Sequence, residues 1–230
     1  MRVHAIFIGH FAPALVVAAQ RRAPHLGILF VAAQFVDYLF AIFLLTGTEH
    51  MRFRQGATAL VPFDLYDMSY SHSLAGTLVA ALLFAGPVYV YYRKVRPAVL
   101  ASVVVLSHWF IDLLVHAADL SLVGGPPKFG LGLWNEPAIA IALELALIGA
   151  AFFFYIRATR PPFRQAGHSR VYILAAVLLA LQLFNWFGPK EGNTTIFALT
   201  MLVVFTALAF LADWAGRGRR TRPFRRKRFH

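Results

Sequence analysis

The side chains of this chain that could carry chemistry are concentrated in one short stretch, SHWFIDLLVH, which runs from Ser107 to His116. On a helix, His108, Asp112 and His116 lie four residues apart and therefore share one face. A histidine and an aspartate one helical turn apart can bind the same metal ion, because the imidazole and the carboxylate then point the same way. The stretch therefore predicts half of a metal site on an otherwise apolar helix.

Further titratable residues interrupt other apolar segments, at His10, Asp37, His72 and Glu144. A charge near the centre of a bilayer costs a few kcal/mol, so several such groups are expected to be partners or ligands of one another. Histidine and carboxylate suit Zn²⁺, Mn²⁺ or Fe²⁺, and the chain has no cysteine to add a thiolate. We therefore expect a divalent metal, with zinc as the first choice.

The elements that must position these residues are apolar segments of about 20 residues, the length at which a helix crosses a bilayer. The 230 residues are 59% hydrophobic and only 14% charged, too few for a water-soluble domain of this length. We predict an all-α, polytopic transmembrane bundle of six to seven membrane helices. The sequence contains seven apolar segments from which this prediction is made, and they are Val3–Ala19, Gly27–Thr48, Ser69–Tyr92, Pro97–Ala117, Asn135–Ile156, Val171–Phe187 and Thr194–Trp214.

The two ends of the chain differ in character. The first segment contains His4, His10 and Pro13; it could be read as a signal peptide, but we expect it to be retained. Residues 1–216 are predicted to form a single transmembrane domain. Residues 217–230 are predicted to form a basic, disordered tail that contacts membrane lipids, and no specific nucleic-acid binding or oligomeric state is indicated.

The basic residues predict the orientation in the membrane. Of 22 Lys and Arg residues, 17 fall in alternate connections and the tail, all on one side. The positive-inside rule then puts the tail in the cytoplasm. In this orientation His10, His72, His108 and Asp112 lie in the outer half of the bilayer, and Asp37 lies roughly 16 Å below the outer end of its helix. Glu144 lies about two to three turns from the outer end of its own helix.

Simpler roles remain open for single residues. His10, His72 and His108 could each donate a hydrogen bond to a backbone carbonyl within a bundle, and Glu144 could pair with an arginine or a histidine. Asp37 is harder to explain without a functional partner, because it lies alone at mid-membrane depth. His116 is nearer the outer surface, where it is solvated or contacts a substrate.

The connection from Gly124 to Asn135 contains four glycines, two prolines and Lys128. Its backbone N–H groups could meet an anionic part of a substrate beside Lys128, or it could be an ordinary re-entrant turn.

Three short motifs resemble a known family. They are His10 near the amino end, His72-Ser73 at the start of a membrane segment, and Ser107-His108-x-x-x-Asp112 within another. In this order they resemble the bacterial inner-membrane, metal-dependent hydrolase family, which is distantly similar to zinc-dependent phospholipase C enzymes. The resemblance covers roughly residues 4–120. It implies that His10, His72, His108 and Asp112 are metal ligands, with Asp37 as a further ligand.

The sequence departs from that family in three places. Only Asp37 stands where the family commonly has an Asp-x-Asp-His cluster, MSYS replaces the Arg-Gly-x-Thr before His72, and a later His-x-x-x-Glu motif is absent.

Three functions fit these residues. The first is a membrane-embedded hydrolase of a lipid or lipid-linked ester, in which the metal polarises an oxygen and Asp37 or Glu144, if not a ligand, is the general base. The second is a transporter or a proton or metal-ion pathway that uses the same cluster. The third is a haem or structural-metal protein. Metal analysis of the purified protein would separate the three.

Overall fold

The computed structural model describes residues 8–161, 167–188 and 192–221, and in these residues the fold is the predicted all-α bundle. A 3-10 helix, η1, covers Ile8–Phe11 and continues into α1. The α-helices are α1 (Ala12–Ala18), α2 (Leu26–Ala33), α3 (Phe35–Thr46), α4 (Leu74–Tyr92), α5 (Val95–Val115), α6 (Pro137–Ala158), α7 (Ser169–Phe187) and α8 (Thr194–Gly216). The segment Leu133–Asn135 is a second 3-10 helix.

Short antiparallel hairpins join some of the helices. Strand β1 (His50–Phe53) pairs with β2 (Phe63–Asp67), and β3 (Leu120–Ser121) pairs with β4 (Lys128–Phe129). Strand β5 (Thr159–Arg160) pairs with β6 (Arg220–Thr221), so the first residues after α8 lie against the end of α6. The predicted tail from residue 222 onward lies outside the described residues.

The helices α4 to α8 are each long and apolar enough to cross a membrane, and α2 with α3 makes a sixth candidate that is bent by 53°. Leu82 on α4 and Phe210 on α8 are 72% and 74% exposed, as expected for side chains that face lipid. The chain is therefore an integral membrane protein. The described part of the first segment, Ile8–Ala18, is a shorter apolar helix of about 16 Å, well below the roughly 30 Å of the hydrocarbon core.

The second predicted segment is broken at Gln34, between α2 and α3. Gln34 has φ −110° and ψ 11°, which interrupts the helical hydrogen-bond ladder. The last carbonyl groups of α2, including that of Ala33, therefore lack helical partners. Asp37 lies in the first turn of α3, where the helix dipole favours a negative charge.

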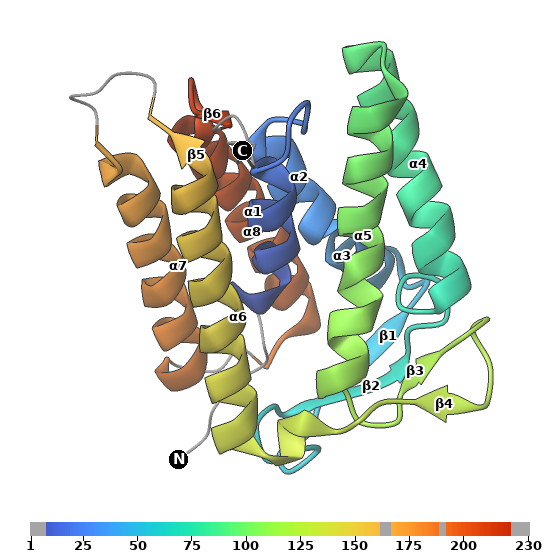
Figure 1. Cartoon of the computed structure of the whole chain (residues 1–230). Helices are drawn as coiled ribbons and strands as arrows, with labels where there is room; N and C mark the ends of the chain where they lie inside the picture. The colour runs from blue at the N-terminus through green and yellow to red at the C-terminus, as the bar shows by residue number, and fades with distance from the viewer. Residues whose placement is uncertain (1–7, 162–166, 189–191, 222–230) are drawn as a thin grey trace, which may run out of the picture.

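The two ends of the bundle differ in charge, as the sequence predicts. The α1–α2 and α4–α5 connections lie at one end with the strand pair β5–β6, at the top of Figure 1. Most of the described basic residues outside the helices are found there. The hairpins β1–β2 and β3–β4 lie at the opposite end, where the described basic residues are Arg52, Arg54 and Lys128.

Close packing against α8 holds α2, the first half of the segment that is broken at Gln34, in place. A Cβ atom on Gly27 would lie 2.7 Å from the Cβ atom of Asp213, so α2 can approach α8 this closely only with a glycine.

At the start of α4, Ser73 is the N-cap and its side chain accepts a hydrogen bond from the Gly76 N–H. The motif His72-Ser73 thus places a histidine directly before a capped membrane helix.

Candidate metal site

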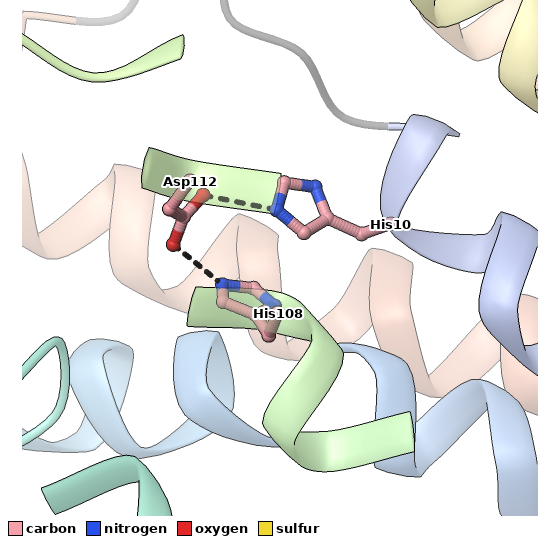
Figure 2. A group of neighbouring side chains, drawn as sticks. All are labelled: His10, His108 and Asp112. Carbon is pink, nitrogen blue, oxygen red and sulfur yellow. Dashed lines mark hydrogen bonds and ion pairs between the residues drawn. The ribbon is translucent and has the colours of Figure 1, made fainter. Parts of the chain in front are cut away.

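The predicted ligands from four separate elements meet in one buried cluster. His10 comes from η1, Asp37 from α3, and His72 from the turn before α4, while His108 and Asp112 come from α5. Figure 2 shows His10 and His108 directed at the Asp112 carboxylate from two sides. The Nε2 atom of His10 lies 2.9 Å from Oδ1 of Asp112, and that of His108 lies 3.1 Å from Oδ2.

Two groups of three ligand atoms could each hold a metal ion, one from His10, His108 and Asp112 and one from Asp37, His72 and His108. Nε2 of His72 lies 3.4 Å from Oδ1 of Asp37 and 3.7 Å from Oδ2 of Asp112. Nε2 of His108 lies 3.7 Å and 3.1 Å from the same two oxygen atoms. Ligands at about 2.0–2.1 Å from a tetrahedral zinc ion are about 3.3 Å apart. These four nitrogen–oxygen distances are close to that value, and the atoms of Asp37, His72 and His108 all lie within 4.8 Å of one another.

The second oxygen atom of Asp112 faces two further histidines. His10 lies on this side, and Nε2 of His116 lies 3.6 Å from the same Oδ1 atom. His116 is only 4% exposed, so the expected solvated position is wrong: the end of α5 is covered, and the Trp134 ring centroid lies 4.0 Å from that of His116.

His108 on α5 and His116, which directly follows α5, are each oriented through the Nδ1 atom. Nδ1 of His108 lies 2.8 Å from the carbonyl oxygen of Ala33, which the break at Gln34 leaves without a helical partner. Nδ1 of His116 lies 2.8 Å from a carboxylate oxygen of Asp119. Carbonyl and carboxylate oxygens only accept hydrogen bonds, so both Nδ1 atoms carry the proton. The Nε2 lone pairs of His108 and His116 therefore face Asp112.

A second buried carboxylate, Glu49, orients His72 through Ser71. Glu49 accepts hydrogen bonds from the backbone N–H groups of Tyr70 and Ser71 and from the Ser71 hydroxyl group. The Ser71 oxygen lies 2.8 Å from Nδ1 of His72, and since its own proton goes to Glu49 it accepts the proton of Nδ1. His72 therefore also turns an Nε2 lone pair toward Asp37 and Asp112.

The donor set fits a metal cation. The Nε2 atoms of His72 and His108 face carboxylate oxygens at 3.1–3.7 Å, an arrangement that needs positive charge between nitrogen and oxygen, either a metal ion or a second proton on each imidazole. Among the described residues, the buried Oδ2 atom of Asp112 has no hydrogen-bond donor. Histidines whose other nitrogen is held by a carbonyl or carboxylate group are typical of metal sites.

Exposure differs sharply within the cluster. The side chains of His10, His72, His108, Asp112 and His116 are at most 5% exposed. The side chain of Asp37 is 21% exposed, so it is the member of the cluster that a substrate or water can reach. Burial lowers the pKa of His116, but the carboxylates of Asp112 and Asp119 raise it by more, so the net shift is upward.

Two predicted site residues lie apart from these ion pairs. The carboxylate of Glu144 accepts hydrogen bonds from the Gly9 backbone N–H at 3.1 Å and from the Gln182 side chain at 3.0 Å. It therefore holds the residue next to His10, and its role as a general base stays a prediction. Lys128 pairs through its backbone with Ser121 in the β3–β4 hairpin, and no hydrogen bond or ion pair joins its side chain to the described residues of the cluster.

Sequence reasoning missed Glu49, Ser71 and Asp119. Asp119 follows His116 by three residues, a spacing that could have signalled the pair. Glu49 lies in the connection between α3 and β1, where a carboxylate is usually solvated, and only the fold brings it to Ser71.

Comparisons of the chain with protein-family models, with curated proteins and with solved structures found no match. Its function is therefore inferred from its own residues and their geometry.

Proposed function

We propose that this protein is a membrane-embedded, metal-dependent hydrolase that binds a divalent ion, with Zn²⁺ as the first choice. The observation that carries the proposal is the buried cluster in which two groups of three ligand atoms, from His10, His108 and Asp112 and from Asp37, His72 and His108, lie within 4.8 Å of one another. Imidazole nitrogens and carboxylate oxygens, without sulfur, suit zinc, and also Mn²⁺ or Fe²⁺. The resemblance of the three histidine motifs to the bacterial inner-membrane, metal-dependent hydrolases points the same way.

A bound divalent ion would supply Lewis acidity, which polarises a phosphoryl or acyl oxygen and activates water. The residues of the chain supply position and access. His72 and His108 are oriented by Ser71 and by the Ala33 carbonyl oxygen, so they would hold the ion in a fixed position. Asp37 is the most exposed side chain of the cluster, so it lies where a substrate would meet the ion. If a substrate displaced Asp37 from the ion, the Asp37 carboxylate could take a proton from an attacking water molecule.

A lipid or lipid-linked phosphoester is the substrate class that this location favours. The cluster is held by helices whose outer faces are apolar, so a substrate dissolved in the bilayer can reach its level without leaving the membrane. The positive-inside rule supports an orientation with the basic end in the cytoplasm, and the site would then lie toward the outer face of the inner membrane.

Metal analysis of the purified protein tests whether it binds a divalent metal ion. We expect about one zinc ion per chain in the wild type, and loss of that ion in His108→Ala. His50→Ala is the matched control, because His50 also contacts an aspartate, Asp67 at 3.0 Å, but lies in the exposed β1–β2 hairpin. Equal metal content in both variants would place the metal elsewhere. A protein that binds no divalent metal would instead favour the transporter, and a haem absorption band the haem protein.

An activity assay tests whether the metal-loaded protein hydrolyses lipid esters. Zinc-loaded protein in lipid nanodiscs should release phosphate or a phosphorylated headgroup from phosphatidic acid or phosphatidylglycerol. The release should stop after chelation and return with added zinc. A protein that holds zinc stoichiometrically but cleaves neither these lipids nor a carboxylic ester lipid would contradict the hydrolase proposal and leave a structural metal site.

A further inference from the structure

A cavity of about 400 Å³ lies at the basic end of the bundle. It is lined by the α1–α2 connection, by the end of α6 and by the residues that follow α8, which form β6. In Figure 1 these segments meet at the top of the bundle, away from the hairpins β1–β2 and β3–β4. This volume is within the range of small-ligand sites.

The lining of this cavity is strongly positive. It contains four arginines and one acidic side chain, Asp213, and the arginines are Arg22, Arg217, Arg219 and Arg220. Asp213 is already engaged, because Nε of Arg217 donates to its Oδ2 atom at 3.0 Å and His25 lies 3.7 Å away. The cavity therefore has an excess of positive charge that its own acidic group does not balance.

One of these arginines is held in a fixed position. Arg219 donates from Nε and from one terminal nitrogen to the Thr159 hydroxyl oxygen at 3.0 and 2.8 Å. The same terminal nitrogen lies 3.1 Å from Nδ1 of His168, and the guanidinium group lies 5.2 Å from the Tyr155 ring centroid. A pre-positioned guanidinium loses little further side-chain entropy when it binds an anion.

The adjoining strand pair adds a second indication. Arg160 of β5 and Arg220 of β6 are direct cross-strand partners. Like charges directly opposite each other destabilise such a pair. Arg220 lines the cavity, so an anion bound there would reduce this repulsion by offsetting the charge of Arg220.

We propose that this cavity binds the phosphate group of an anionic phospholipid from the leaflet at the basic end. Arginine binds phosphate through paired, charge-assisted hydrogen bonds. A lipid is the source that the location favours over free phosphate, because the cavity opens at the ends of membrane helices. Its lining also includes the apolar residues Ala18, Pro24 and Leu26 beside the arginines. This site is separate from the metal cluster and does not depend on the hydrolase proposal.

The test measures lipid retained by the full-length protein. Wild-type protein and the double variant Arg22→Gln with Arg217→Gln are incubated in mixed micelles of phosphatidylglycerol and phosphatidylcholine, and bound lipid is measured by native mass spectrometry. We expect the double variant to bind phosphatidylglycerol at least about 100-fold more weakly, since two charge-assisted hydrogen bonds to the phosphate group are lost. Arg219 is left intact because it also holds Thr159 and His168.

The matched control is Lys94→Gln with Arg96→Gln, which removes the same charge at the same end of the bundle but outside the cavity lining. It should retain phosphatidylglycerol like the wild type. Equal loss in both double variants would show a general surface-charge effect and overturn the site, as would equal retention in all three proteins. If inorganic phosphate at millimolar concentration displaces the lipid completely, free phosphate and not lipid is the ligand. An unchanged far-UV circular dichroism spectrum and an unchanged thermal unfolding midpoint confirm that the cavity variant is folded.

Discussion

Asp112 and Glu144 are two carboxylates buried in membrane helices, and the chain surrounds them differently. Both are at most 3% exposed. Glu144 accepts hydrogen bonds from amide groups, the Gly9 backbone N–H and the Gln182 side chain. Asp112 is surrounded by imidazole nitrogens at 2.9–3.7 Å, which belong to His10, His72, His108 and His116.

The difference teaches how a structural carboxylate can be told from a metal ligand. Amide N–H groups can only donate, so they stabilise the Glu144 carboxylate without any ion. The imidazoles of His72, His108 and His116 use their Nδ1 protons elsewhere and turn lone pairs toward Asp112. The imidazoles can offset the charge of Asp112 only by sharing a metal ion with it or by taking up a second proton, whereas the amide groups of Gly9 and Gln182 donate to Glu144 as they are.

The largest effect is expected from Asp112→Asn, which keeps the shape of the side chain but removes its charge. Four-ligand zinc sites bind with about 10–16 kcal/mol, so loss of one charged ligand should weaken zinc binding by at least about 100-fold. Zinc affinity is measured by competition with a chelator of known affinity. Affinity within a few fold of the wild type would remove Asp112 from the site and end the contrast with Glu144.

Acid should weaken the metal site strongly. Histidine ligands bind metal only when neutral, and their usual pKa is about 6.5, so zinc affinity should fall by about 100-fold or more from pH 7.5 to 5.5. The carboxylates near His116 raise its pKa, so protons compete with the metal at the higher end of this range. Titration of zinc binding against pH checks this, and a flat profile would contradict histidine ligation.

A smaller effect is expected from Glu49→Gln, which acts on the site through Ser71 and His72. Groups that orient metal-bound histidines typically contribute 10- to 100-fold to metal affinity, and glutamine keeps one acceptor oxygen, so a loss of about tenfold is expected. Ser71→Ala should give a similar loss because it breaks the same chain. If either variant changes thermal stability but leaves zinc affinity unchanged, this chain is structural only.

The smallest effect on the metal is expected from Glu144→Gln. A neutral amide oxygen can still accept from the Gly9 N–H, so unfolding free energy should fall by about 1 kcal/mol and zinc affinity should stay within about twofold. Thermal unfolding and chelator competition measure the two. A large loss of zinc would mean that Glu144 belongs to the metal site and would remove the contrast with Asp112. Hydrolysis lost with zinc retained would support Glu144 as the general base.

Local sequence patterns determined much of this protein. Apolar segment length predicted the membrane helices and the four-residue spacing of His108 and Asp112 placed both side chains on one face of α5, because both features depend only on helix geometry. The distribution of Lys and Arg predicted which connections share an end of the bundle.

Only the tertiary structure decided which of the buried polar residues meet. The break at Gln34 exposes the Ala33 carbonyl to His108, and Glu49 reaches His72 through Ser71 from the α3–β1 connection. Glu144 also interrupts an apolar helix, but it has no histidine one turn away and it meets amides from Gly9 and Gln182. These partners are far apart in the chain, so no local periodicity encodes them. They are fixed by how the helices pack, because packing alone determines whether a donor or a lone pair faces each buried carboxylate.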